Sequence, residues 1–161
     1  MFLKGPHGPF FNFLAKMLTH AGAEIWRVGF NAGDRVFWSR QDRYCAYRET
    51  VSDWPDAFAR LVREKSVTDL VLYGDTRPVH ALAIQGARQF NLQVHVFEEG
   101  YLRPYWVTYE RDGSNGHSKL MAMQLSDMSE ALKTGSLDEP AAPAQWGVMR
   151  HHMFYGALYH F

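Results

Sequence analysis

The alternation of short apolar runs with amphipathic helical segments is the feature that most restricts the fold of this chain. The runs that read as strands are residues 1–3, 24–30, 70–73 and 93–97. The segments with helical spacing between them are residues 10–21, 54–62 and 79–90. Strands that alternate with helices predict a parallel sheet with right-handed crossovers and helices on both faces. We therefore expect an α/β fold with a Rossmann-like parallel sheet.

Local signals refine the ends of these elements. Pro9 suits the first turn of the first helix, and Ser52 or Asp53 can cap the second helix. We expect a turn at residues 31–34. Residues 36–47 are rich in aromatic side chains and stay irregular in this interpretation, with room for one short strand.

Length and charge limit the domain organisation and the partners. A chain of 161 residues that is 47% hydrophobic can form one ordinary core but not two full-sized domains. We expect a Rossmann-like domain over residues 1–118, then a linker and an aromatic-rich segment, residues 119–161, that lead to a further domain. The 17 basic and 17 acidic side chains balance, so no nucleic-acid partner is expected.

The compartment and the metal content follow from what the sequence lacks. A single cysteine, Cys45, excludes an internal disulfide and a multi-cysteine zinc site. Glycine and proline come too early for a secretory signal, and no apolar run approaches the about 20 residues of a membrane span. We expect a cytoplasmic protein. His151, His152 and His160 have no carboxylate or cysteine at ligand spacing, so no metal is expected.

Two glycine- and proline-containing loops follow predicted strands. In the loop of residues 5–9, His7 and Gly8 can bring backbone N–H groups near an anionic ligand at a helix start, although two prolines also suit a stiff structural turn. In the loop after Tyr73, Asp75, Arg77 and His80 can orient a sugar or bind an anion. The alternative there is a helix cap with an Asp–Arg pair.

The third loop carries paired acids at the end of the strand 93–97. Glu98 and Glu99 point to opposite sides of an extended backbone, so only one is expected to face the cleft and act as general acid or base. Beyond them Arg103 can hold a carboxylate or phosphate, and Tyr101 and Trp106 offer flat faces for a sugar. A solvated acidic turn is the alternative.

The last polar stretch covers residues 112–118. Its Asp-Gly and Asn-Gly pairs predict a tight hairpin, with site lining by Asn115 as a secondary interpretation. Ligands in open parallel sheets bind outside the carboxyl ends of the strands. We therefore expect three segments to gather on one rim of the sheet: the loop of residues 5–9 (the opening loop), the loop after Tyr73 (the arginine-bearing turn) and the paired acids Glu98 and Glu99.

Four ordered motifs resemble one family. They are GPHGPFF from residue 5, FNAGDRVFW from residue 30, GDTRP from residue 74, and FEEGYLRP from residue 97 followed by WVT and NG. Together they are similar to the capsule polysaccharide biosynthesis and export family, and within it to transferases that place the first β-Kdo residue on a lysophosphatidylglycerol anchor. The resemblance runs from residue 2 to about residue 118.

This resemblance implies the chemistry and the partners. It implies a retaining glycosyltransferase that uses CMP-Kdo as donor and a lipid as acceptor, with a GT-B-like architecture of which this chain is the N-terminal half. No separate cofactor is implied. Related transferases carry an acid-acid-glycine motif, matched by Glu98, Glu99 and Gly100, and a His-Pro motif in the other half that grips the CMP phosphate. This chain contains no His-Pro dipeptide, and Ala32 stands where a second glycine is expected.

Two other functions remain open at this stage. A nucleotide-sugar epimerase half would share the fold, and a non-catalytic module could dock on a capsule assembly at the membrane. The resemblance implies capsule synthesis and export proteins as partners, with peripheral association at the cytoplasmic face of the inner membrane.

Overall fold

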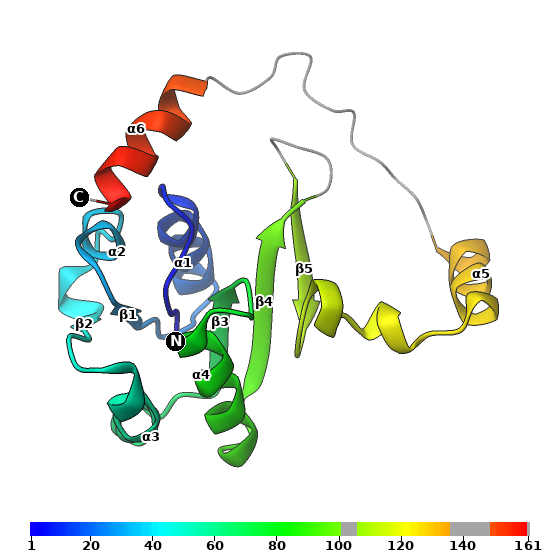
Figure 1. Cartoon of the computed structure of the whole chain (residues 1–161), viewed down its shortest axis with the longest axis horizontal. Helices are drawn as coiled ribbons and strands as arrows, with labels where there is room; N and C mark the ends of the chain where they lie inside the picture. Colours follow the sequence, from blue (N-terminus) through cyan, green and yellow to red (C-terminus); the bar gives the residue numbers. More distant parts are fainter. Residues whose placement is uncertain (101–105, 136–148, 161) are drawn as a thin grey trace.

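The structure is a computed structural model that describes residues 1–100, 106–135 and 149–160 (Figure 1). The helices are α1 (Phe10–His20), α2 (Ala32–Val36), α3 (Trp54–Glu64), α4 (Pro78–Gln89), α5 (Leu125–Thr134) and α6 (Met149–His160). The strands are β1 (Arg27–Gly29), β2 (Tyr44–Ala46), β3 (Asp69–Tyr73), β4 (Gln93–Glu99) and β5 (Val107–Arg111). The expected α/β class is confirmed.

The first three residues hold the sheet together. Phe2 forms parallel bridges to Arg27 of β1 on one side and to Val71 of β3 on the other. Its N–H donates to the carbonyl of Trp26 at 2.8 Å, and the N–H of Leu3 donates to the carbonyl of Val71 at 3.0 Å. The predicted first strand therefore lies at the centre of the sheet, between β1 and β3.

The strand order is that of a doubly wound fold. β2 pairs in parallel with β1, and β4 pairs in parallel with β3. Counting residues 1–3 as the first strand, the order across the sheet is third, second, first, fourth, fifth, which is the order of the dinucleotide-binding folds. The predicted parallel pairing is confirmed for all of these strands, including a short one inside the segment left irregular.

The sheet ends in a strand that sequence analysis did not predict. β5 pairs antiparallel with β4, from His95 opposite Arg111 to Glu99 opposite Val107. The N–H of Gly100 also donates to the carbonyl of Trp106 at 2.8 Å, next to the last pair of the two strands. The hairpin expected at residues 112–118 was wrong, because this stretch instead forms a turn and a short 3-10 helix, Asn115–His117.

Apolar side chains pack on both faces of the sheet. On one face α3 and α4 cover Leu3, Leu70, Leu72 and Val96, together with the buried ring of Trp54. On the other face α1 covers the side chains that alternate with them, including Phe2, Val71 and Phe97. This alternation is the period of two that strands impose. The expected helices on both faces are confirmed.

Two local expectations need correction. Residues 31–34 do not form a simple turn, since the Asn31 side chain accepts a hydrogen bond from the N–H of Asp34 at 2.8 Å and caps α2. The second strand is also shorter than residues 24–30, with pairing limited to Arg27–Gly29.

The C-terminal part contains two helices of different placement. Figure 1 shows α5 standing away from the sheet, and its residues are all exposed apart from the half-buried Met128. α6 lies beside α2 and contacts it. Within residues 1–100, 106–135 and 149–160, no helix has the length and apolar character needed to cross a membrane.

Candidate functional site

A polar cavity of about 430 Å³ lies at the carboxyl ends of the first strand, β3 and β4. Its lining residues are Lys4, Gly5, Pro6, His7, Tyr73, Gly74, Thr76, Arg77, Glu98, Glu99 and Tyr159. We call it the rim cavity. The expected gathering of the opening loop, the arginine-bearing turn and the paired acids on one rim is thus observed. The cavity lies where the strand order reverses, which is the usual position of ligand sites in such sheets.

Both acids of the pair line the rim cavity. Glu98 accepts a hydrogen bond from the N–H of Glu99 at 3.2 Å, and a side chain on Gly74 would meet its Oε2 at 3.2 Å. The expectation that only one acid faces the cleft was wrong. The pairing of β4 with β3 ends at Phe97 opposite Tyr73, so Glu98 and Glu99 extend past the end of β3 and both residues reach the rim cavity.

Arg77 lines the rim cavity from the start of α4. It occupies the N-cap position, and Pro78 follows as the first helical residue. Its Nη1 donates to the carbonyl of Tyr73 at 3.0 Å, which ties the guanidinium to the end of β3. The alternative of an Asp–Arg pair is not what forms, because Asp75 turns elsewhere.

Asp75 is buried and serves the neighbouring turn. Its Oδ2 accepts hydrogen bonds from the N–H of Ser114 at 2.9 Å and from His117 Nδ1 at 3.1 Å. Asn115, a predicted binding residue, belongs to this turn and adopts a left-handed backbone with φ of 50°. Neither Asp75 nor Asn115 contributes to the rim cavity lining.

His80 is fully buried beneath the rim and does not line the cavity. Its Nδ1 lies 2.7 Å from the carbonyl of Gly74, so Nδ1 carries the hydrogen and donates it. Nε2 has no hydrogen-bond partner in the described part of the chain. Burial lowers the pKa of His80 from 6.5 to about 4, so the ring is neutral at neutral pH.

The opening loop contributes His7 but not Gly8 to the lining. Gly8 has a φ of 103°, and a side chain there would meet the ring of Tyr155 at 3.2 Å. Its role in the structure is therefore close packing against α6.

Sequence reasoning missed Lys4, Tyr73 and Thr76, which adjoin the predicted loops, and also Tyr159 of α6, which lies far from them in the sequence. The Tyr159 hydroxyl lies 3.2 Å from the carbonyl oxygen of Gly5 and 3.1 Å from Asp34 Oδ1. Burial, together with the Asp34 carboxylate, raises the pKa of this phenol above its usual range. The only sequence signal was the aromatic density of the segment that contains Tyr159, which was interpreted as leading to a further domain and not as part of a site.

A buried ion pair supports Tyr159 from below. Arg27 Nη2 donates to Asp34 Oδ1 at 2.8 Å, and both side chains are almost fully buried. The guanidinium also lies over the rings of Phe11 and Trp38, at 5.8 and 5.4 Å from their centroids. A buried ion pair, held between aromatic rings, therefore lies beneath the opening loop.

Three predicted residues remain, of which the structure describes one, Trp106. Tyr101 and Arg103 fall outside the described residues. Trp106 is half-buried next to β5, and its carbonyl accepts the hydrogen bond from Gly100. Among the residues that the structure describes, no group of three potential ligands could hold a metal ion.

Comparisons with known proteins bear on this arrangement. The model of the family described as capsule polysaccharide biosynthesis protein matches residues 68–147. The capsule polysaccharide export protein KpsS of Escherichia coli is 38% identical over 120 residues, which are 74% of this chain and 31% of that protein. The chain belongs to the capsule polysaccharide biosynthesis family.

A second relative agrees with this assignment. The capsule polysaccharide modification protein LipB of Neisseria meningitidis serogroup A is 36% identical over 121 residues, 74% of this chain and 29% of that protein. The serogroup B protein of the same name matches equally. The chain thus spans about a third of the length of these family members. The family model includes the rim segments of Gly74–Arg77 and Glu98–Glu99.

Proposed function

We propose that this chain forms the acceptor-side half of a retaining glycosyltransferase of capsule synthesis, which transfers Kdo from CMP-Kdo to a lysophosphatidylglycerol acceptor. The observation that supports this most is the convergence of two carboxylates and a guanidinium on one polar cavity at the switch point of the sheet. Membership of a capsule polysaccharide family supports the carbohydrate chemistry.

The proposed reaction begins with departure of CMP, which leaves positive charge on the anomeric carbon and ring oxygen of Kdo. A carboxylate of Glu98 or Glu99 stabilises that charge, and the other accepts the proton of the acceptor hydroxyl. Arg77, which is fixed at the end of β3, suits the carboxylate of Kdo or the acceptor phosphate, because a guanidinium binds either in bidentate geometry.

The proposal extends beyond this chain because the chain matches only part of each relative. Because the matched segment is about a third of their length, the nucleotide-binding half of a GT-B-like enzyme is expected on sequence beyond this segment. We place the enzyme in the cytoplasm, at the inner face of the inner membrane, where capsule synthesis and export proteins are its partners and no cofactor besides the donor is needed.

The test is transfer of labelled Kdo by a longer protein that contains this chain. Glu98→Gln and Glu99→Gln should each lower kcat by about 100-fold or more if the acids act in proton transfer and charge stabilisation. Glu130→Gln on the exposed α5 is the matched control and should leave transfer unchanged. Normal transfer in both rim variants contradicts the proposal. Absence of transfer by the unsubstituted protein, with binding to other capsule proteins, favours a non-catalytic module.

A further inference from the structure

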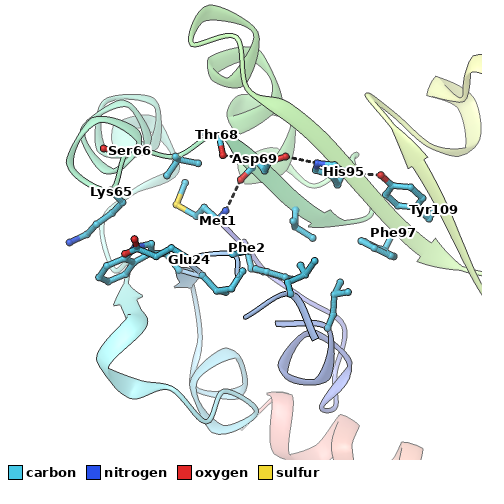
Figure 2. A pocket seen from close by; sticks show the side chains of 17 residues that line it. Met1, Phe2, Glu24, Lys65, Ser66, Thr68, Asp69, His95, Phe97 and Tyr109 are labelled. Atoms are coloured by element: carbon cyan, nitrogen blue, oxygen red, sulfur yellow. Dashed lines mark hydrogen bonds and ion pairs between the residues drawn. The ribbon is translucent and has the colours of Figure 1, made fainter. Parts of the chain in front are cut away.

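A second cavity, of about 560 Å³, lies on the α1 face of the sheet near the amino end of β3. Most of its wall is apolar and includes Leu14 and Leu18 of α1, Ile25, Val71 and Phe97. Its volume falls within the about 300–1,000 Å³ that is usual for small-molecule sites. Figure 2 shows the lining side chains, with Glu24 and Lys65 at one side and Tyr109 at the other.

This apolar cavity is separate from the rim cavity. Phe10 of α1 packs between them, with its ring centroid 6.0 Å from that of Tyr73 and 5.6 Å from that of Phe97. Tyr73 lines the rim cavity and Phe97 lines the apolar one. A ligand of the apolar cavity therefore does not occupy the proposed transfer site.

One wall of the apolar cavity is polar and organised. Asp69, His95 and Tyr109 come from three adjacent strands and form a continuous row of hydrogen bonds (Figure 2). His95 Nε2 lies 2.8 Å from Asp69 Oδ1, and His95 Nδ1 lies 2.8 Å from the Tyr109 hydroxyl. The rings of His95 and Tyr109 are stacked, with an interplanar angle of 13°.

The direction of these hydrogen bonds follows from chemistry. Hydrogen bonds from Thr68 and His95 lower the pKa of Asp69, so its carboxylate is ionised and can only accept. His95 Nε2 must then donate, and in the neutral ring Nδ1 is the acceptor. The Tyr109 O–H donates to Nδ1, which leaves only acceptor capacity on the Tyr109 oxygen and on Asp69.

The charged residues at the opposite side are already engaged. Glu24 forms an ion pair with Arg43 and accepts from Trp26 Nε1 at 3.2 Å. Lys65 Nζ lies over the Trp26 ring, 4.2 Å from its centroid. The Met1 amino group also lies in this wall, where burial lowers its pKa to about 6 and it donates to the carbonyl of Asp69. Above that pH it is uncharged, so the row of acceptors favours a hydrogen-bond donor, and the Asp69 carboxylate disfavours an anion beside it.

We propose that this cavity binds a neutral single-chain amphiphile, with the alkyl chain along α1 and a terminal hydroxyl that donates to the Asp69–His95–Tyr109 row. The apolar wall buries the chain, and the row of acceptors selects the hydroxyl over a carboxylate. This proposal stands independently of the transfer reaction at the rim.

Calorimetric titration with n-decanol and with sodium decanoate, both at about pH 8, tests the selection. Decanol should bind saturably, and decanoate should bind at least about tenfold more weakly. Tyr109→Phe removes the hydroxyl from a half-exposed side chain and should weaken decanol binding by about three- to tenfold, because it removes an acceptor for the ligand.

A pair of variants in α1 tests the place of binding. Leu18→Trp fills the cavity and should abolish binding, whereas Met17→Trp, on a side chain that is 70% exposed and outside the lining, should not change it. The circular dichroism spectrum of each variant verifies folding. Equal affinity for decanol and decanoate, decanol binding that persists in Leu18→Trp, or no binding of decanol by the unsubstituted chain overturns the proposal.

Discussion

His80 illustrates how burial changes the behaviour of a single side chain. Sequence reasoning placed it among the ligand-binding residues, because it follows a strand in a glycine- and arginine-containing loop. In the structure α4 turns it inward, and the carbonyl of Gly74 takes its only donor. A buried imidazole with a low pKa is a neutral structural group and a source of acid sensitivity.

The stability of the fold should therefore decline in acid through His80. The folded pKa of about 4 lies below the ordinary 6.5, so the unfolded chain binds the proton first as pH falls. The free energy of unfolding should drop by about 3 kcal/mol across that window, from pH 6.5 downward. Urea unfolding at a series of pH values measures it. His80→Leu should flatten the slope, and His20→Gln, at an exposed position, should not.

Asp75 is a second residue that was predicted to bind a ligand but instead stabilises the fold. Asp75→Ala leaves the buried N–H of Ser114 without its acceptor and should cost about 1–3 kcal/mol of unfolding free energy. Asp112→Asn alters an exposed ion pair with Lys119 in the same turn, and should change stability by less than about 0.5 kcal/mol. Denaturant titration of both variants distinguishes them, and equal losses would show that the Asp75 contacts do not matter.

At the scale of elements, α6 completes the rim cavity by packing on α2. The contact is close because Gly33 has no side chain: a Cβ there would lie 2.5 Å from Tyr159 Cδ2 and 2.6 Å from its Cα. α2 itself exists because Asn31 caps it and Asp34 is held by Arg27. A capped helix with a glycine at its second position is thus the docking point for a helix far along the chain.

Gly33→Ala should release α6 from α2. Hydrogen exchange at the amides of α6 should accelerate. The amides of β3 and β4 should keep their protection, because the core clusters on the two faces of the sheet do not include α6. Gly156→Ala is the control within α6, since a Cβ there meets nothing within 4 Å. It should raise helix stability by about 1 kcal/mol. Unchanged exchange in Gly33→Ala would contradict the packing.

For the whole molecule, Phe2 is the side chain on which both halves of the sheet depend. It is 1% exposed and packs against Phe11 and Trp38, at centroid distances of 5.0 and 5.9 Å. Phe2→Ala should lower the free energy of unfolding by about 3–5 kcal/mol. Phe13→Ala, on an exposed part of α1, should change it by well under 1 kcal/mol, because little packing is lost and alanine has the higher helix propensity. Thermal unfolding followed by circular dichroism compares the two.

Sequence patterns predicted the helices and strands that have a clear local periodicity. They missed the features that depend on contacts between residues far apart in the sequence. The apolar run at residues 70–73 and the helical spacing of α1 and α4 gave their elements within one or two residues. β5 carries no such pattern, because its half-buried positions are the polar Thr108 and Glu110, whereas Val107 and Tyr109 are exposed. Tyr159 could not be placed in the site, since its neighbour Gly5 lies 154 positions away.

The central position of residues 1–3 has a consequence for how the sheet assembles. Their hydrogen bonds run to Trp26 and Val28 on one side and to Asp69 and Val71 on the other, so the latter pairings close a loop of nearly seventy residues. Such distant pairing is entropically expensive and slow to form. Residues 1–3 can complete their hydrogen bonds only after β3 has come into contact with them. The folding rate should therefore respond more to changes at Val71 than to changes in the local helices.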